Sequence, residues 1–143
     1  APRPDGITQS AAIRIALDEA NYTSDDVVYI NAHGTGTALN DVSETVAFKL
    51  ALGEDAYKAH ISSTKGSTGH MLGAAGAVEA VASVLALKSG IVPPTINLDE
   101  IEPECDLDYT PNTPVKTDLT LAVSDSLGFG GHNGCLVFRK FVK

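Results

Sequence analysis

The chain has 143 residues, of which 43% are hydrophobic, and its formal net charge is −8 at pH 7. This length allows one ordinary domain with a real core and is too short for two. The acidic excess argues against nucleic acid or a membrane surface as the partner, because both require a basic face. The two cysteines have no metal-ligand spacing, and no secretory leader opens the chain, so we expect a cytoplasmic protein, or one of an organelle matrix.

The first thirty residues predict a helix followed by a strand. Apolar residues recur at helical spacing over residues 8–21, which is typical of an amphipathic helix with one packed face. Residues 27–32 (VVYINA) are β-branched and aromatic, as in a buried strand. This strand would place His33 at its carboxyl end.

A second helix and strand are expected next. The helix would begin at Asn40 or Asp41 and end at Gly53, with Glu44 as the capping-box partner of Asp41. Residues 60–63 then indicate a second, weaker strand. The pattern so far alternates helix and strand.

The second half begins with an apolar helix over residues 73–89, interrupted by charged and hydroxyl side chains and therefore better suited to a protein core than to a bilayer. Its first turns consist of small residues, which allow another backbone to approach closely. Residues 92–114 predict an irregular crossing. Strands over 119–127 and 135–141 would form a hairpin joined by the glycine-rich connection 128–134. The order α-β-α-β-α-β-β predicts a layered α/β domain whose last strand pair is antiparallel.

Three polar loops containing glycine stand out, at residues 31–37, 63–70 and 127–131. Loops that follow strand ends in an α/β domain commonly converge on a site. Each loop alone has a structural interpretation: a single histidine after a strand is usually a satisfied structural residue, and GFGG can be a tight turn.

Taken together, the three loops resemble the C-terminal half of the β-ketoacyl-acyl carrier protein synthases, the condensing enzymes of fatty acid synthesis, in order and approximate spacing. The connecting segments match as well, and the resemblance covers essentially the whole chain: VPPTINLD, CDLDY and NGCLVF. It implies a thiolase-like fold of two similar α/β halves stacked in five layers. Residues 1–143 would supply the C-terminal half, with a mixed sheet of the five-stranded type, and the nucleophilic cysteine would lie in the absent N-terminal half.

The resemblance implies that His33 and His70 are the two active-site histidines. In such enzymes a malonyl carrier loses CO2, and its carbanion attacks an acyl-cysteine thioester. A developing enolate requires neutral hydrogen-bond donors aimed at the thioester oxygen, and two imidazole N–H groups provide them.

Further site residues follow from the same resemblance. Lys65 would set the electrostatics of the site without acting as nucleophile; a solvated loop lysine is the alternative. Thr35 and Thr37 would hold the phosphopantetheine arm of the carrier through their hydroxyl groups. Phe129 would stand at the pocket entrance, with its backbone N–H in the oxyanion hole.

The family also has a polar cluster that can hold a monovalent cation, and its members here would be Asn31, Glu79, Ser124 and Asp125. No other metal site or cofactor is expected. The chain departs from the family pattern at Gly36, where serine is common, at Leu127, where an aromatic residue is usual, and at Asp125, where asparagine is usual. These departures concern pocket gating and the cation cluster.

The remaining cysteines and histidines are not expected to carry chemistry. Cys105 lies in an acidic stretch that would raise its pKa, and Cys135 lies within a predicted strand. His60 precedes a strand and His132 falls in the hairpin connection, so both are expected to be structural or exposed to solvent.

The sequence therefore predicts a 3-oxoacyl-acyl carrier protein synthase, an acyltransferase whose complete form is a homodimer and whose partner is acyl carrier protein. This chain alone would be inactive without the cysteine. A polyketide ketosynthase and a non-catalytic thiolase-like partner subunit are the alternatives, although an inactive subunit would have no chemical need for His33, His70 and Lys65. The isolated chain should aggregate or pair through its small-residue helix, and the basic surface that would dock an acidic carrier should lie on the other half.

Overall fold

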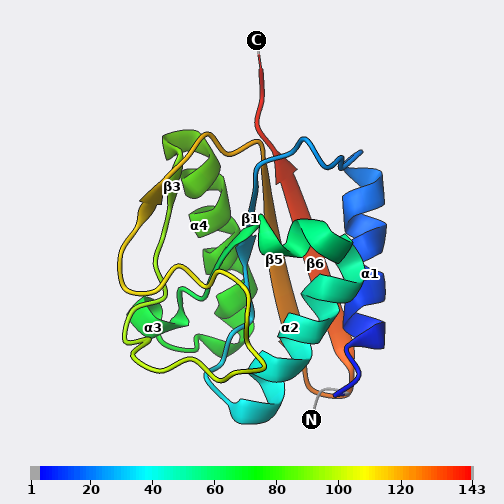
Figure 1. Ribbon diagram of the computed structural model, residues 1–143, viewed down its shortest axis with the longest axis vertical. Helices are drawn as coiled ribbons and strands as arrows, with labels where there is room; N and C mark the ends of the chain where they lie inside the picture. The colour runs from blue at the N-terminus through cyan, green and yellow to red at the C-terminus, as the bar shows by residue number, and fades with distance from the viewer. Residues whose placement is uncertain (1–3, 143) are drawn as a thin grey trace.

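A computed structural model describes residues 4–142, with helices on both faces of a mixed β-sheet (Figure 1). The helices are α1 (Ile7–Glu19), α2 (Ala38–Leu52), the short α3 (Lys65–Thr68) and α4 (Ala75–Ser89), with 3-10 turns η1 (Gly53–Tyr57) and η2 (Leu72–Ala74). The strands are β1 (Val28–Asn31), β2 (His60–Ser62), β3 (Ile91–Val92), β4 (Val115–Lys116), β5 (Leu121–Gly128) and β6 (His132–Arg139).

The main sheet has the strand order β2-β1-β5-β6. β1 is parallel to β2 and to β5, whereas β6 pairs antiparallel with β5, as predicted for the last strand pair. The described residues thus contribute four strands to this sheet and not the expected five. β3 and β4 form a separate two-stranded ribbon.

The two faces of the sheet are covered by different helices. Side chains of consecutive strand residues point to opposite faces. Ile30 accordingly packs in the core cluster with Ile13 of α1 and Phe48 of α2, whereas its neighbour Tyr29 packs with Leu87 of α4. In Figure 1, α1 and α2 cover one face and α4 the other.

Most predicted elements are present, with shifted ends. Pairing of β5 with β6 extends to Gly128 and His132, so His132 belongs to a strand and the hairpin connection is shorter than predicted. The β3–β4 ribbon, which the sequence did not indicate, pairs the two ends of the irregular crossing. Gly53 does end α2.

The beginning of α2 differs from the prediction. The helix starts at Ala38 with Thr37 as N-cap residue, before either predicted cap, and no side chain caps it by hydrogen bonding. Glu44 is therefore too far from the helix start to complete a capping box. The capping-box interpretation was wrong because the carboxylate has a tertiary partner, described below.

α4 is only partly enclosed by the rest of the fold. Segment Leu72–Ser89 is long and apolar enough to cross a membrane by length and composition alone, a property that core helices share, and 28% of it is buried. Its inner side packs on β5 and β1, while Val81, Val84 and Leu85 remain exposed on its outer side. The helix that was predicted to need neighbours on most sides thus has an uncovered apolar face.

Candidate active site

The two histidines meet at the carboxyl end of the sheet. His33 lies two residues after the end of β1, and His70 lies between α3 and η2, so elements distant in sequence bring them together. Their ring centroids are 5.5 Å apart, with the rings nearly perpendicular at 86°. The predicted imidazole pair therefore exists as a geometric unit.

His33 is held in its neutral form. Its side chain is buried, with 8% of the residue exposed. Burial is the main cause that lowers the pKa of His33 to about 4, and the nearby charges of Lys65 and His70 lower it further. At neutral pH the ring therefore carries one N–H donor and no charge.

His70 is oriented by the backbone that follows it. The N–H of Leu72 donates a hydrogen bond of 3.1 Å to Nδ1 of His70. Because an acceptor nitrogen cannot carry the proton of a neutral imidazole, this bond places the N–H on Nε2. Leu72 adopts a left-handed φ of 50°, so the turn is a strained one.

Glu44 supports the His33 loop from within the core. Its carboxylate accepts hydrogen bonds of 2.7 Å each from the backbone N–H groups of His33 and Gly34 and from Nδ2 of Asn40. Burial raises the pKa of Glu44 to about 8, while the three donors oppose that rise. The helix-start pattern indicated Glu44 only as a capping-box residue. The signal for its buried role was a carboxylate on the face of α2 that carries the buried Ala47 and Phe48.

Asp125 lies near Glu44 and apart from the predicted cation cluster. It follows Ser124 in β5, so its side chain points to the opposite face. There Oδ2 accepts a 2.6 Å hydrogen bond from Gln9 of α1. Burial raises the pKa of Asp125 to about 7. The side chain of Asp125 therefore points away from that of Ser124, and a part for Asp125 in the cation cluster stays a prediction.

Lys65 is buried and paired. Its Nζ donates a hydrogen bond to Oε1 of Glu79 on α4, and 9% of Lys65 and 2% of Glu79 are exposed. The solvated-loop interpretation of this lysine is thus excluded. Its fixed ammonium group is one of the charges that keep His33 neutral.

Asn31, Ser124 and Glu79 do gather on the α4 face. Asn31 is the register partner of Ser124 across β1 and β5. Nδ2 of Asn31 donates to Oη of Tyr29 at 3.1 Å and to Oγ1 of Thr64 at 3.3 Å. Within residues 4–142, Oδ1 of Asn31 and Oε2 of Glu79 are buried without a hydrogen-bond partner. Two such oxygens and a serine hydroxyl are suitable donors for a hard monovalent cation, so these three residues fit the predicted ion.

Thr35 and Thr37 lie on the exposed loop before α2. Their Oγ1 atoms are 3.0 Å apart and hydrogen-bonded to each other. Thr37 is the N-cap residue of α2, yet its hydroxyl makes no capping bond. Gly36 between them has a φ of 72°, and no atom lies within 4 Å of the position of a Cβ there. Both hydroxyl groups are therefore available to a ligand.

Phe129 stands at the tip of the β5–β6 hairpin, followed by Gly130 and Gly131, which both have a φ of 81°. It is 96% exposed and is not among the residues that line the cavity beside the histidines. The structure thus brings Lys65 to the two histidines but leaves the ring of Phe129 in solvent.

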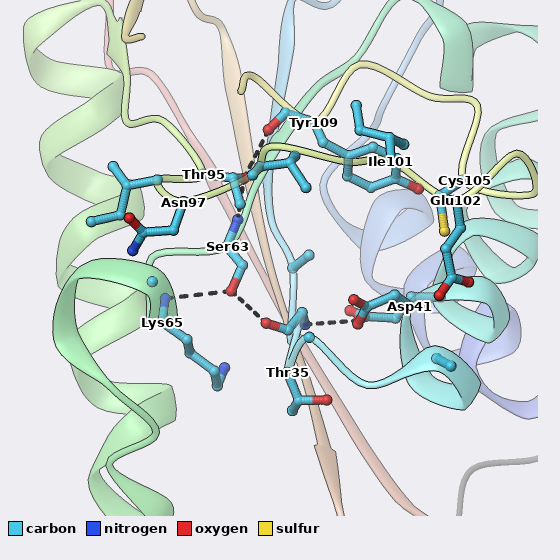
Figure 2. A pocket seen from close by; sticks show the side chains of 18 of the residues that line it. Thr35, Asp41, Ser63, Lys65, Thr95, Asn97, Ile101, Glu102, Cys105 and Tyr109 are labelled. Carbon is cyan, nitrogen blue, oxygen red and sulfur yellow. Dashed lines mark hydrogen bonds between the residues drawn. The ribbon is translucent and has the colours of Figure 1, made fainter. Parts of the chain in front are cut away.

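A cavity of about 460 Å³ adjoins the site. Thr35 and Lys65 line one end, and the segment with Ile101 and Cys105 lines the other (Figure 2). His70 also lines this cavity. Burial raises the pKa of the Cys105 thiol most, and Asp41, Glu102 and Glu104 raise it further, which confirms a poor thiolate. Burial likewise raises the pKa of Cys135 to about 12.

Comparisons with known proteins agree with this geometry. Residues 1–99 match the family model of the β-ketoacyl synthase C-terminal domain. The chain is 52% identical over 141 residues to 3-oxoacyl-[acyl-carrier-protein] synthase 2 of Synechocystis sp. and 50% identical to the protein of the same name from Staphylococcus aureus, covering 99% of this chain and 34% of each relative. The chain therefore spans about a third of the length of these curated relatives.

Solved structures give the same picture. One is the AntDE:AntF complex, a type II PKS acyl-carrier protein with its ketosynthase bound to the hexaketide, with a TM-score of 0.94, 40% identity and coverage of 99% of this chain and 35% of that one. Another is a beta-ketoacyl synthase from Burkholderia phymatum, with a TM-score of 0.89, 36% identity and coverage of 97% and 34%. These matches are with ketosynthases, whose fold is thiolase-like, as expected.

Proposed function

The chain belongs to the β-ketoacyl synthase family, and we propose that it forms the part of a 3-oxoacyl-acyl carrier protein synthase that stabilises the condensation transition state. The pair of imidazoles 5.5 Å apart, with His33 held neutral, carries this proposal. It is supported by the identity to synthases named for this reaction.

The proposed reaction is a decarboxylative Claisen condensation. The bond between the malonyl α-carbon and its carboxylate breaks, CO2 leaves, and the electron pair forms an enolate. The enolate carbon attacks the carbonyl of an acyl group held as a thioester on a cysteine elsewhere in the enzyme, and the cysteine thiolate leaves. The product is a 3-oxoacyl group on the carrier.

His33 and His70 would donate hydrogen bonds to the oxygen of the malonyl thioester as the enolate forms. A neutral donor suits this role because it stabilises developing charge without transferring its own proton first. Nε2–H of His70 is already defined by the bond from Leu72. Lys65 would act through its charge, by keeping His33 uncharged.

The exposed residues Thr35, Thr37 and Phe129 would contact the phosphopantetheine arm of the carrier and the entrance to the pocket. Thr35 and Thr37 would bind the amides of phosphopantetheine, since within residues 4–142 their hydroxyl groups bond only to each other. Phe129 would move over the pocket mouth from its present exposed position and contribute its backbone N–H to the oxyanion hole. A monovalent cation, where bound, would supply positive charge between Asn31, Glu79 and Ser124.

Intact-mass spectrometry of the full enzyme with an acyl carrier protein thioester tests the proposal. We expect an acyl adduct on a cysteine outside residues 1–143. The His33→Ala and His70→Ala variants should still be acylated but should lose condensation and release of CO2 from malonyl carrier. His60→Ala, in which a partly buried histidine beside Asp108 and outside the site is removed, is the matched control and should keep both activities. An adduct on Cys105 or Cys135, or normal condensation by both histidine variants, would contradict the proposal.

A polyketide ketosynthase is the second candidate, favoured by the similarity to the AntDE:AntF complex. Product analysis separates the two: one condensation per loaded acyl group indicates fatty acid elongation, whereas repeated condensation on one unreduced chain indicates polyketide assembly. A non-catalytic partner subunit would show neither.

The assembly and location of the enzyme are also proposals. We infer a homodimer that works with acyl carrier protein in the cytoplasm or an organelle matrix. The exposed apolar side of α4, with Val81, Val84 and Leu85, supports burial against further protein. Sedimentation of the full enzyme would test the dimer, and a stable monomer at high concentration would exclude it.

A further inference from the structure

Basic side chains in this acidic protein are mostly neutralised by carboxylates. Among the residues that the structure describes, five basic side chains form ion pairs with Asp or Glu: Lys49, Lys58, Lys65, Arg139 and Lys140. The others, which form no such pair, are Arg14, Lys88 and Lys116. Lys88 and Lys116 line the same surface cleft.

A second cleft, of about 290 Å³, collects these two lysines together with Lys140. Lys88 comes from the last turn of α4, Lys116 from β4, and Lys140 follows β6 directly. Ser89 and Thr117 add hydroxyl groups to its lining. We call this set of five residues the lysine cleft.

The backbone under the lysine cleft is fixed by tertiary contacts. The N–H of Thr117 donates a 2.9 Å hydrogen bond to the carbonyl of Gly90, and Lys116 pairs with Ile91 in the β3–β4 ribbon. A Cβ at Gly90, where φ is 68°, would lie 2.9 Å from the carbonyl oxygen of Thr117. The close approach of α4 to β4 thus requires glycine at this position.

The lysine cleft is remote from the histidines. It lies at the C-terminal end of α4, whereas the catalytic loops lie at the N-terminal end of that helix (Figure 1). A helix of 15 residues separates its ends by about 22 Å at roughly 1.5 Å per residue. The cleft is therefore not an extension of the site described above.

Its local charge is opposite to that of the whole chain. Among the described residues that line it, the only carboxylate is that of Asp118, which accepts a hydrogen bond of 2.7 Å from Lys140 and whose side chain is 88% exposed. Three ammonium groups against one carboxylate leave a net charge of about +2, within a chain of net charge −8. A favourable interaction with the carbonyl end of α4 explains why Lys88 lies here without a carboxylate partner. It does not explain the position of Lys116, which lies in β4.

We propose that the lysine cleft binds a small phosphate-bearing anion, with a diphosphate group as the chemical class. Lysine ammonium groups bind phosphate as point charges, and adjacent hydroxyl groups can donate to its remaining oxygens. The site is a shallow depression that opens to solvent, and its volume, near the lower limit of about 300 Å³ for small-molecule pockets, suits one compact ligand. The acidic remainder of the chain would repel nucleic acid and an anionic membrane surface.

Titration calorimetry of the full enzyme with inorganic pyrophosphate, at constant ionic strength, tests this proposal. We expect saturable binding that weakens as NaCl is raised. The Lys88→Ala/Lys116→Ala double variant should bind about tenfold more weakly or worse. Arg14→Ala removes the other unpaired basic side chain, and Lys58→Ala a paired one; neither should change the affinity.

Three outcomes would overturn the proposal. The first is unsaturable binding, which would indicate an adventitious ion effect only. The second is an equal loss of affinity in the Arg14→Ala control, which would indicate general charge attraction. The third is binding to vesicles containing phosphatidic acid without binding to pyrophosphate, which would indicate a membrane headgroup site.

Discussion

The two faces of the sheet bury different kinds of side chain, mainly apolar on one face and partly polar and charged on the other. The face toward α1 and α2 is filled by a large apolar cluster that includes Ile30 and Phe48. The face toward α4 has a smaller apolar cluster, and next to it the hydrogen-bonded group of Tyr29 and Asn31 and the Lys65–Glu79 ion pair. The first face is stabilised mainly by removal of apolar area from water. The second is stabilised by hydrogen bonds and an ion pair between buried groups, each of which requires its partner.

This difference separates stability from chemistry in the fold. Both faces become polar toward the carboxyl ends of the strands, where Glu44 on one side and Lys65 on the other support His33. Buried polar groups at this end of the sheet lower the stability of the fold unless each has a hydrogen-bond or ion-pair partner. The loss of stability caused by a substitution on the α4 face should therefore depend on whether one or both members of a polar pair are replaced. On the α1 and α2 face, it should depend on the side-chain volume that is removed.

The largest effect should come from breaking the buried ion pair. Glu79→Ala leaves the Lys65 ammonium group buried without its carboxylate, and should lower the free energy of unfolding by about 3–5 kcal/mol. Urea denaturation of the full chain measures it. The double variant Lys65→Met/Glu79→Leu removes both charges and should recover most of the loss; an equal loss in both variants would show that volume, and not charge, governs this face.

Tyr29→Phe should have the next largest effect. It removes the phenol that contacts Oγ of Ser62 at 3.0 Å and Nδ2 of Asn31 at 3.1 Å. Loss of these buried partners should cost about 1–3 kcal/mol in the same denaturation experiment. Tyr57→Phe is the control, because the hydroxyl of Tyr57 donates a hydrogen bond to Asp106 at the surface. It should change the free energy of unfolding by less than about 0.5 kcal/mol.

Ile30→Val tests the apolar face. Ile30 is fully buried, and removal of one methylene should cost about 0.5–1.5 kcal/mol through lost burial and a small cavity. Ile7→Val, at a site that is 54% exposed, should be close to neutral. A cost for Ile30→Val as large as that of Tyr29→Phe would remove the distinction between the faces.

The charge of Lys65 should be visible at His33. Because the ammonium group disfavours a second positive charge, the pKa of His33 should rise above about 4 in the Lys65→Met/Glu79→Leu variant. The rise should be partial, since burial remains the larger cause. NMR titration of the His33 ring measures this change; Lys58→Met is the control, and an unchanged midpoint would show that Lys65 does not act on His33.

Leu85→Ser should have the smallest effect on stability. Leu85 is 56% exposed on the outer side of α4, so the free energy of unfolding should change by less than about 0.5 kcal/mol. Self-association of the chain should nevertheless decrease, as light scattering would show. Ile15→Ser, on the exposed side of α1, should leave association unchanged; if it reduces association equally, the apolar face of α4 has no special part in it.

The errors of the sequence analysis share one cause. Glu44 was assigned to a capping box because helix-start patterns are local, whereas its carboxylate bonds to the backbone of a strand end eleven residues earlier. Asp125 was grouped with Ser124 through the family resemblance, whereas alternation in β5 directs the two side chains to opposite faces. His132 was placed in a loop because glycines weaken the strand signal, while pairing with Gly128 extends the hairpin. In each case a partner distant in the chain or on the other strand decided the outcome.

The sequence by itself determined the alternation of helices and strands and the positions of His33 and His70 at their ends, because hydrophobic periodicity and short loop motifs are local properties of the chain. The tertiary structure alone decided that the two rings meet, that Lys65 pairs with Glu79, and that Glu44 holds the His33 loop. It also decided that two unpaired lysines share one cleft. The physical reason is that burial and charge pairing depend on packing between segments far apart in the chain, which no local pattern encodes.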